Sequence, residues 1–595
     1  MSNREGHPAI EPSGLKFHDT VAHLIAKGLN RHGVDLVFGQ SLPSLLHMAC
    51  AQIGIRQIGY RTENAGGYMA DAYARITGRV AIVTAQNGPA ATLLVPPLAE
   101  ALKASIPIVA LVQEVNRNQT DRNAFQEFDH LALFSSCSKW VRRVTEASRV
   151  EDYLDQAMMN ACSGRPGPAV LLLPADLLSE TAPACVRHAN LGHFPLDRTV
   201  ANDESITQAA ELIRSAKAPV MIAGGGIHIS GAAQMLATLQ EDTHLPVATT
   251  TMGKGAVDER HPLSIGVVGS FMGVNSATRH QRSLITDADV VVLVGNRTNQ
   301  NGTDSWTLYP QNAHFIHIDV DGTEIGRNYE ALRLVGDARE TLKALHRVLI
   351  SGDLSQRQAN RATLEQRIAD GREAYFKESL SVRQSDARTV QPNQPIRPER
   401  IMHEIDQRLT ADTIVVADAS YSSTWVANFL TSLQPGMRFL TPRGLAGLGW
   451  GFPMALGAKL ARPTSAVICV VGDGGFGHVW SELETAIREN IKIVLIVLNN
   501  GILGFQKHAE NVKFGDHTTA VDFAPVDHAA IARACGCRDI RIEDPSLFGP
   551  ALDVALNETP DDAVAANQTT VIEVICDPDA FPPLTIFTSC LESKP

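Results

Sequence analysis

Two apolar runs, each followed at once by a short polar motif, constrain the fold of this chain more than any other feature. The run over 465–471 leads into Gly472-Asp-Gly-Gly475, and the run over 491–498 leads into Asn499-Asn500. Apolar runs of this length, bounded by turn residues, are typical of buried parallel strands. Apolar residues recur at helical spacing over about 479–489, which predicts a helix between the strands. The two strand ends of such a βαβ unit lie at one edge of the sheet, where open α/β sheets bind ligands.

The polar residues at these strand ends predict a magnesium–diphosphate site. Asp473 and Asn500 can converge on one hard cation, whose remaining ligands are typically phosphate oxygens and water. Gly472, Gly474 and Gly475 leave backbone N–H groups uncovered, and the expected helix directs its positive end toward the same place. An isolated Gly-Asp-Gly would be explained by an ordinary turn between a strand and a helix. Here the motif is followed at the expected spacing by a helix, an apolar strand and an Asn pair, which favours the metal–diphosphate site.

Composition indicates a large globular protein. The 595 residues exceed what one core holds and suggest about three to four domains. A hydrophobic share of 44% with 19% charged residues excludes a disordered or fibrous chain, and the net charge of −12 argues against a nucleic-acid or membrane partner. Nine scattered cysteines suggest reduced thiols in a cytoplasmic protein, and no run of about 18 apolar residues predicts a membrane span. We also expect no signal peptide in the polar N-terminal stretch.

The order of apolar runs divides the chain into three α/β blocks. We predict three doubly wound parallel-sheet domains, at 14–185, 205–348 and 398–582, with a charged helix and linker over 349–397. The third of these domains carries the diphosphate motif.

The Gly-Asp-Gly and Asn-Asn motifs, with 24 residues between Gly474 and Asn499, resemble the signature of thiamine-diphosphate (ThDP) enzymes. The resemblance implies a pyrimidine-binding first domain, a central nucleotide-binding-like domain and a diphosphate-binding third domain. Arg61–Gly78 resembles the family segment that begins with a catalytic Glu, which is Glu63 here. That Glu shares a proton with the cofactor's pyrimidine ring, and burial of the carboxyl should raise its pKa. By itself, Glu63 would be read as an acid that suits a helix N-terminus. Asn87 opens a turn resembling the one that packs against the pyrimidine.

Further motifs resemble the acetohydroxyacid (acetolactate) synthase large-subunit branch over nearly the whole chain. Residues 123–127, Asn-Ala-Phe-Gln-Glu, resemble a motif whose Gln faces the reaction centre, which implies a catalytic role for Gln126. Residues 163–169 and 447–458 resemble two glycine-rich motifs of the same branch.

The same resemblance implies four more cofactor contacts. Leu448 stands where a Met holds the two cofactor rings in a V shape, and a Leu can pack in the same way. Tyr421 and Ser422 lie in the loop beside the diphosphate. The third metal ligand would be the main-chain carbonyl of Ile502.

The central block resembles the domain that holds FAD in this branch and ADP in some relatives. Gly224-Gly-Gly226 follows a predicted strand, and small residues at a strand end allow close approach of a nucleotide. The alternative is a plain loop in an empty domain. We expect a nucleotide here, with FAD ahead of ADP.

Some positions depart from the branch. The position of the acceptor-binding Arg holds Asn301, and the position of a Trp that shapes acceptor choice holds Ala509. Residues 40–43 replace the loop that borders the reacting oxygen, and Thr62 replaces a His. We expect Ala509 to leave open space and Asn301 to favour an uncharged acceptor such as an aldehyde or a thioester. Acetolactate formation should then be slow, without a preference for 2-oxobutyrate.

His47 and His508 fall in segments expected near the reaction centre. Either could transfer protons near neutral pH. An isolated His is more often a packing or surface residue, and we expect a packing role for each.

These features predict a ThDP- and Mg²⁺-dependent enzyme that decarboxylates a 2-oxo acid and joins the remainder to an acceptor. Two alternatives remain open: a 2-hydroxyacyl-CoA lyase or a 2-oxo acid/acyl-CoA decarboxylase, and a non-catalytic regulatory protein of the same fold. Intact Glu63, Asp473 and Asn500 argue against the regulatory alternative. The resemblance also implies a homodimer or homotetramer with active sites at the subunit interface, because one cofactor must contact two domains of different chains.

Overall fold

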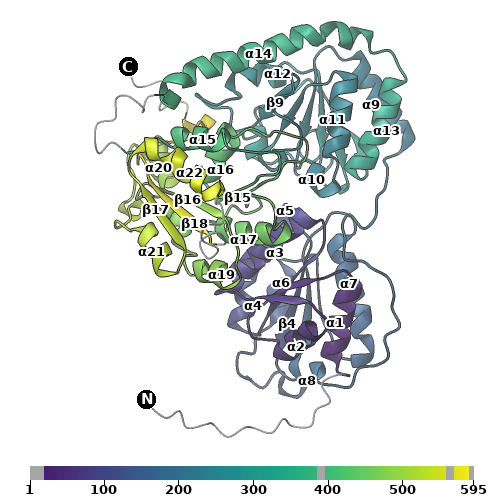
Figure 1. Cartoon of the computed structure of the whole chain (residues 1–595). Helices are drawn as coiled ribbons and strands as arrows, with labels where there is room; N and C mark the ends of the chain where they lie inside the picture. Colours follow the sequence, from purple (N-terminus) through teal and green to yellow (C-terminus); the bar gives the residue numbers. More distant parts are fainter. Residues whose placement is uncertain (1–18, 385–394, 558–567, 588–595) are drawn as a thin grey trace.

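The computed structural model describes residues 19–384, 395–557 and 568–587. Three six-stranded sheets, each with all strands parallel and with helices packed around it, follow one another along the chain (Figure 1). This arrangement confirms the predicted α/β class. In the described part of the chain, no helix combines the length and the apolar character needed to cross a membrane.

The first sheet has the strand order β2-β1-β3-β4-β6-β5. Its strands are β1 (Leu36–Phe38), β2 (Arg56–Ile58), β3 (Ala81–Ala85), β4 (Ile108–Glu114), β5 (Trp140–Arg143) and β6 (Ala169–Pro174). Its helices are α1 (Val21–Arg31), α2 (Ser44–Gln52), α3 (Glu63–Thr77), α4 (Pro89–Leu93), α5 (Val95–Ala104), α6 (His130–Ser135), α7 (Val150–Cys162) and α8 (Ala175–Leu178).

The central sheet has the order β12-β11-β10-β7-β8-β9. Its strands are β7 (Pro219–Ala223), β8 (Val247–Thr249), β9 (Ser264–Val267), β10 (Val290–Val294), β11 (His314–Asp319) and β12 (Ala331–Val335). Its helices are α9 (Asp203–Ser215), α10 (Gly226–Ser230), α11 (Ala233–Thr243), α12 (Arg282–Thr286) and α13 (Ala338–Ile350). The long helix α14 (Ser355–Gln384) runs across this block (Figure 1) and occupies most of the predicted linker. The linker residues 385–394 and the first residues of the predicted first domain, 14–18, lie outside the described residues.

The third sheet has the order β14-β13-β15-β16-β18-β17. Its strands are β13 (Ile414–Ala417), β14 (Phe439–Leu440), β15 (Val467–Gly472), β16 (Val494–Asn499), β17 (Arg538–Ile542) and β18 (Thr570–Ile575). Its helices are α15 (Pro398–Asp406), α16 (Tyr421–Phe429), α17 (Gly451–Ala461), α18 (Asp473–Phe476), α19 (Glu482–Arg488), α20 (Gly504–Phe514), α21 (His528–Ala534) and α22 (Phe548–Asn557).

The helix predicted over about 479–489 differs from the observed one. The glycine motif itself forms the one-turn helix α18, and α19 begins only at Glu482. The turn between them is held by N–H groups of Gly477 and Val479 that bond to carbonyls three or four residues back. The helix dipole expected at this strand end is therefore that of a single turn, so a diphosphate bound here would rely on nearby N–H groups and a cation.

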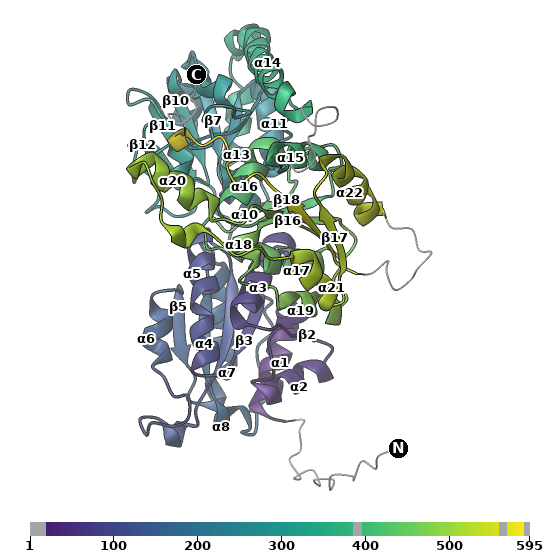
Figure 2. The same ribbon diagram turned by 90° about the vertical axis from the view of Figure 1, so that its left-hand side faces the viewer.

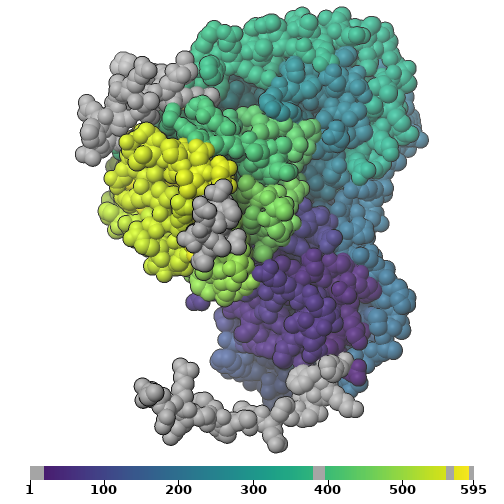
Figure 3. All heavy atoms as spheres, viewed as in Figure 1, coloured from purple at the N-terminus to yellow at the C-terminus, as the bar shows by residue number. Residues whose placement is uncertain are grey.

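The first and third blocks share one hydrophobic core, which fixes their relative placement. Helices α3 and α17 lie side by side in both ribbon views (Figures 1 and 2). A Cβ added at Gly457 would lie 2.1 Å from the carbonyl oxygen of Met69, so only glycine permits this approach. The rings of Tyr68 and Trp450 stack with centroids 4.4 Å apart. The space-filling view shows the two blocks in broad contact (Figure 3).

Candidate active site

The predicted metal ligands converge at the carboxyl edge of the third sheet. Asp473 directly follows β15, and Asn500 directly follows the neighbouring strand β16. Asp473 Oδ2 accepts the N–H of Gly501 at 2.8 Å, and Asn500 Oδ1 accepts the N–H of Ile502 at 3.2 Å. Burial raises the pKa of Asp473 to about 6, and within the described residues this carboxylate forms no ion pair. A buried carboxylate without a cationic partner fits a bound metal ion.

A cavity of about 1040 Å³ opens above this edge. It is lined by Gly472–Gly475, Asn500, Ile502 and Leu448, by the start of α16, and by residues of the central block. A Cβ added at Gly472 would meet only Ser422 Oγ, at 3.9 Å, so this glycine leaves a free cradle. A Cβ at Gly475 would instead lie 2.1 Å from Asp418 Oδ2. The cavity therefore has a form that suits a diphosphate group, with backbone exposed at Gly472.

Helix α16 points its N-terminus into the same cavity. Ser420, Tyr421 and Ser422 all line it, and Ser420 has a φ of 62°. Left-handed backbone at a non-glycine residue costs free energy and recurs at functional sites. Tyr421 is held by a hydrogen bond of 2.7 Å between its hydroxyl and His508 Nδ1.

Asp418, which the sequence interpretation missed, fixes the loop that carries Leu448. Its carboxylate accepts the N–H groups of Gly449 at 2.9 Å, Trp450 at 3.1 Å and Gly451 at 3.0 Å. The side chain is 1% exposed, and burial raises its pKa. Asp418 directly follows the apolar run that forms β13, and this position at a strand end could have marked it as a site residue. Asp418 thus fixes the turn next to Leu448 close to the glycine motif, because a Cβ at Gly449 would lie 2.9 Å from the carbonyl oxygen of Gly475.

Glu63 is the first residue of α3, at the carboxyl edge of the first sheet. Its side chain is 9% exposed, and burial raises its pKa. Within the described residues, no other side chain or backbone group forms a hydrogen bond or ion pair with its carboxylate. The backbone segment that precedes Glu63 is held by the third block. The buried carboxylate of Glu482 accepts the N–H groups of Arg61 and Thr62 at 3.1 Å each. Glu63 is therefore held rigidly at its backbone, while its protonatable carboxyl group remains available to a ligand.

Asn87 and Gln126 lie together at the same edge as Glu63. Asn87 Nδ2 donates to the carbonyls of Phe125 at 3.2 Å and Gln126 at 3.0 Å. Gln86 Nε2 donates to Gln126 Oε1 at 2.7 Å. Gln126 has a φ of 61°, and a Cβ at Gly88 would lie 2.7 Å from Gln126 Cβ. The two predicted residues thus form one interlocked, strained turn.

A buried network behind this turn was also not anticipated from sequence. Gly88 donates its N–H to His130 Nε2 at 3.1 Å, so that nitrogen is unprotonated. His130 Nδ1 then carries the hydrogen and donates to Glu114 Oε1 at 3.2 Å. Arg143 Nη2 donates to the same carboxylate at 2.9 Å. This chain of contacts holds Gly88, and through it the Gln126 turn.

The two groups of predicted residues do not meet within one chain. The residues that line the 1040 Å³ cavity come from the central and third blocks, from Ser270 onward. Glu63, Asn87 and Gln126 lie at the edge of the first sheet and contribute nothing to that lining. The structure therefore holds two half-sites.

Comparison with known protein families identifies the domains that carry the two half-sites. Residues 19–133 match the family domain described as "Thiamine pyrophosphate enzyme, N-terminal TPP binding domain". The family's central domain matches residues 206–345, and its C-terminal TPP binding domain matches residues 418–574. The chain belongs to the thiamine pyrophosphate enzyme family. The two half-sites fall in the two TPP binding domains, one in each.

Individual relatives extend over nearly the whole chain. A probable acetolactate synthase large subunit of Methanococcus aeolicus is 33% identical over 90% of this chain and 90% of its own length. A probable acetolactate synthase large subunit of Methanocaldococcus jannaschii is 32% identical over 94% and 92%. The acetolactate synthase isozyme 2 large subunit of Escherichia coli is 28% identical over 90% and 93%. The resemblance to this branch of the family is confirmed.

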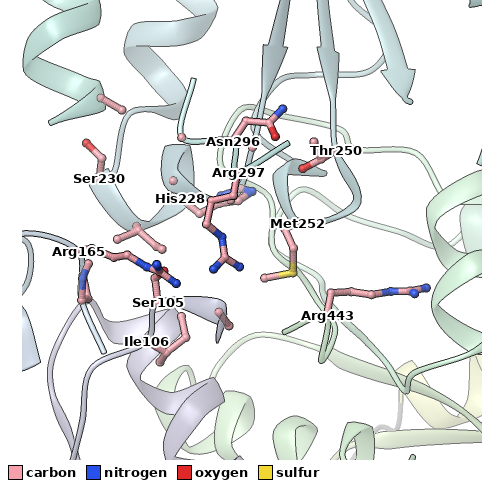
Figure 4. A pocket seen from close by; sticks show the side chains of 18 of the residues that line it. Ser105, Ile106, Arg165, His228, Ser230, Thr250, Met252, Asn296, Arg297 and Arg443 are labelled. Atoms are coloured by element: carbon pink, nitrogen blue, oxygen red, sulfur yellow. The ribbon is translucent and has the colours of Figure 1, made fainter. Parts of the chain in front are cut away.

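A second cavity, of about 160 Å³, lies where the three domains of this TPP enzyme meet. Arg165 and Arg297 point into the same space (Figure 4). Arg165 pairs with Glu324 at 3.0 Å, whereas Arg297 has no ion pair in the described part of the chain. Burial and the neighbouring Arg165 lower the pKa of Arg297. Two cations facing one space fit an anionic ligand.

The glycines of this cavity have a structural explanation. A Cβ at Gly224 would lie 2.2 Å from the carbonyl oxygen of Gly295, and one at Gly226 would lie 2.6 Å from Gly295 Cα. Gly224 and Gly226 are therefore required for packing of the ends of β7 and β10, whether or not a nucleotide binds. Asp319, at the end of β11, is better evidence for a nucleotide, because it lines the cavity at a strand end where a ribose could bond.

His47 and His508 have packed environments. His47 Nε2 lies 2.9 Å from Thr84 Oγ1, and burial lowers its pKa to about 4. His508 contacts the rings of Tyr421, Phe581 and Phe587, and burial lowers its pKa to about 4. Both side chains are neutral at pH 7.

The departures at Asn301 and Ala509 differ in their surroundings. Asn301 lines both cavities. Ala509 does not line the large cavity, and the expectation of open space there is wrong. Ala509 packs against a cluster that contains Phe271, Leu584 and Phe587, because the C-terminal segment folds back over this region.

Proposed function

We propose that this chain is an acetolactate-synthase-like carboligase that uses ThDP and Mg²⁺. It would decarboxylate a 2-oxo acid and join the remainder to an acceptor. The observation that carries the proposal is the convergence of Asp473, Asn500 and the Ile502 loop on a cavity whose floor, at Gly472, is open backbone. The relatives are acetolactate synthase large subunits, which favours carboligation over the lyase or decarboxylase alternative.

The metal and the diphosphate would be held by the third domain. Asp473, Asn500 and the carbonyl of Ile502 supply three oxygen ligands of the kind that Mg²⁺ prefers. In the described part of the chain no three His, Cys, Asp or Glu side chains gather into a metal site, so phosphate oxygens and water complete this one. The backbone of Gly474 and Gly475 would face the diphosphate, and Tyr421 and Ser422 would border it.

The bound cofactor supplies an electron sink at its thiazolium ring, and the protein supplies placement and proton transfer. Leu448, which lines the large cavity, would pack against the bound cofactor. Glu63 would hold a proton for a pyrimidine nitrogen of the cofactor, a role that suits an acid whose pKa is raised by burial. Asn87 and Gln126 would border the pyrimidine and the reacting carbon, and His130 holds their turn through Gly88.

The separation of the half-sites supports assembly from at least two copies of the chain. A two-fold axis would bring Glu63 of one copy to the cavity of the other and make two equivalent sites. Pairing of two dimers would give a homotetramer. Light scattering tests the assembly: an active monomer would contradict it.

A nucleotide in the smaller cavity is the second part of the proposal. Its diphosphate would lie between Arg165 and Arg297, and its ribose near Asp319. FAD and ADP share this chemistry. The absorption spectrum of the purified protein, together with chromatography of nucleotides released by heat, distinguishes FAD, ADP and an empty cavity. We further propose a cytoplasmic location, which cell fractionation tests.

One screen tests the proposed reaction. The protein is supplied with ThDP and Mg²⁺ and offered a panel of 2-oxo acids and acyl-CoA thioesters, and released CO₂ and products are identified. We expect cofactor-dependent CO₂ release from pyruvate with formation of a carbon–carbon-bonded product. Cleavage of a 2-hydroxyacyl-CoA without reaction of any 2-oxo acid would instead establish the lyase alternative.

A further inference from the structure

The large cavity has an uneven distribution of charge. Four carboxylates line it: Asp304, Asp418, Asp473 and Asp577. Among its described lining residues there is one cation, Arg443. Asp418 is occupied by three backbone N–H groups, and Asp473 is the proposed metal ligand. Arg443 is therefore the cation that this half-site offers to an anion bound away from the metal.

Arg443 is held in place without a neutralising partner. Its Cζ lies 5.4 Å from the centre of the Phe271 ring, and its Nη2 donates to Ser423 Oγ. Its Nε is buried and has no hydrogen-bond partner, and no carboxylate of the described residues forms an ion pair with it. The nearby carboxylate of Glu100 is already bonded to the N–H groups of Gly444 and Leu445. Such a cation is costly unless an anion joins it.

The guanidinium group belongs to the large cavity rather than to the small one. Arg443 borders both. In Figure 4 its side chain extends away from Arg165, Arg297 and the other labelled residues of the small cavity. Of its two protein contacts, Phe271 lines the large cavity, and Ser423 lies on α16 between the cavity residues Ser422 and Thr424. In the small cavity, Arg165 and Arg297 would then bind the diphosphate of the proposed nucleotide without Arg443.

We propose that Arg443 binds the carboxylate of the acceptor, which would accordingly be a second 2-oxo acid. This inference rests on the proposed carboligase function. A guanidinium can present two parallel N–H groups to a carboxylate, and stacking on Phe271 limits the orientations it can adopt. Asn301 carries no charge, and Arg443 supplies the positive charge from a different element. The expectation of an uncharged acceptor is replaced by this inference.

The chemistry of the reaction separates the acceptor from the donor. The donor loses its carboxylate: its C1–C2 bond breaks, CO₂ leaves, and the electron pair stays on C2. A cation beside that carboxylate would stabilise the charged ground state more than the transition state and slow the step. The acceptor keeps its carboxylate while its carbonyl carbon bonds to the donor's C2 and its carbonyl oxygen takes up a proton. A fixed cation is therefore useful only to the acceptor.

The test compares acceptors with and without a carboxylate. Wild type, Arg443→Met and the surface control Arg533→Met each receive pyruvate as donor, with either pyruvate or acetaldehyde as acceptor. We expect Arg443→Met to lower kcat/KM for the pyruvate acceptor by about 10- to 100-fold, the effect of losing one charge-assisted hydrogen bond. CO₂ release in a single turnover, before an acceptor is needed, should stay within about twofold of wild type, as should acetaldehyde use and ThDP affinity. Arg533 is 69% exposed on α21, and its variant should match wild type throughout.

Several results would overturn the inference. Equal losses with both acceptors would assign Arg443 to the cofactor or to the fold, and a loss of bound nucleotide would assign it to the small cavity. Unchanged kinetics would leave it without a role in substrate binding. If Arg443→Met does not fold, Arg443→Gln keeps a donor for Ser423 without the charge, and it must show the same selective loss. Absence of CO₂ release from any 2-oxo acid by the wild type would instead refute the proposed function.

Discussion

Replacing Asp418 by Asn tests whether this buried carboxylate holds the cofactor loop. Oδ1 accepts the N–H groups of Trp450 and Gly451, and Oδ2 accepts that of Gly449. Asn can keep the first two bonds through its oxygen. Its NH₂ group would then face the N–H of Gly449, so one bond is lost and two donors are left opposed.

Loss of a hydrogen bond to a charged group, with an unpaired buried donor, costs about 2–3 kcal/mol. Part of this is offset because a neutral amide is easier to bury than a carboxylate whose pKa is raised by burial. A net cost of about 2 kcal/mol remains. If the loop must be ordered for the cofactor to bind, the Kd for ThDP rises about 30-fold.

Fluorescence of Trp450, which lies in this loop, reports a ThDP titration of wild type and variant at fixed Mg²⁺. Asp412→Asn makes the same chemical change at an exposed position just before β13 and should leave the titration unchanged. A Kd for Asp418→Asn within about twofold of the wild-type value would refute the argument that Asp418 orders the loop.

Three further predictions concern the first domain. Glu63→Gln should keep ThDP binding but lower kcat by about 10²- to 10⁴-fold, because an amide cannot share a proton with the pyrimidine; turnover near wild type would exclude Glu63. His130→Leu should lower kcat about tenfold without weakening ThDP binding, because the N–H of Gly88 loses its acceptor. His130→Gln offers Gly88 another acceptor and should recover most of the lost kcat. Equal losses of kcat in the two variants would mean a purely structural role for His130. The pKa of His47 is lowered to about 4, so between pH 6.5 and 4 the unfolded chain binds more protons and the wild type loses stability as pH falls. Between pH 7 and pH 4.5, the free energy of unfolding measured with urea should fall by about 2 kcal/mol less for His47→Gln than for the wild type. Equal falls for the two proteins would contradict a lowered pKa for His47.

Local patterns in the sequence were sufficient for the fold and for one half of the site. The run predicted at 465–471 corresponds to β15, at Val467–Gly472, because a strand buried on both faces is almost wholly apolar. The placement of Asp473 and Asn500 followed from the rule that neighbouring parallel strands end at one edge. The helix after Gly475 was misplaced, since periodicity does not reveal where a turn interrupts a helix.

The missed residues share one property: their partners are distant in sequence. Glu482 bonds to the N–H of Arg61 across 421 positions, and Arg443 stacks on Phe271 in another domain. Periodicity and motif spacing carry no information about such contacts. Ala509 shows the same limit, because the space beside it is filled by Phe587 from the far end of the chain.

The central claim is that one active site needs Glu63 from one chain and Asp473 from another. Complementation tests it directly: Glu63→Gln and Asp473→Ala are each inactive alone and are then co-expressed with different affinity tags. Random pairing makes half of the dimers mixed, and each mixed dimer has one of its two sites intact, so we predict about one quarter of the wild-type activity. Doubly tagged protein that is isolated as a mixed assembly and has no activity would contradict the shared site.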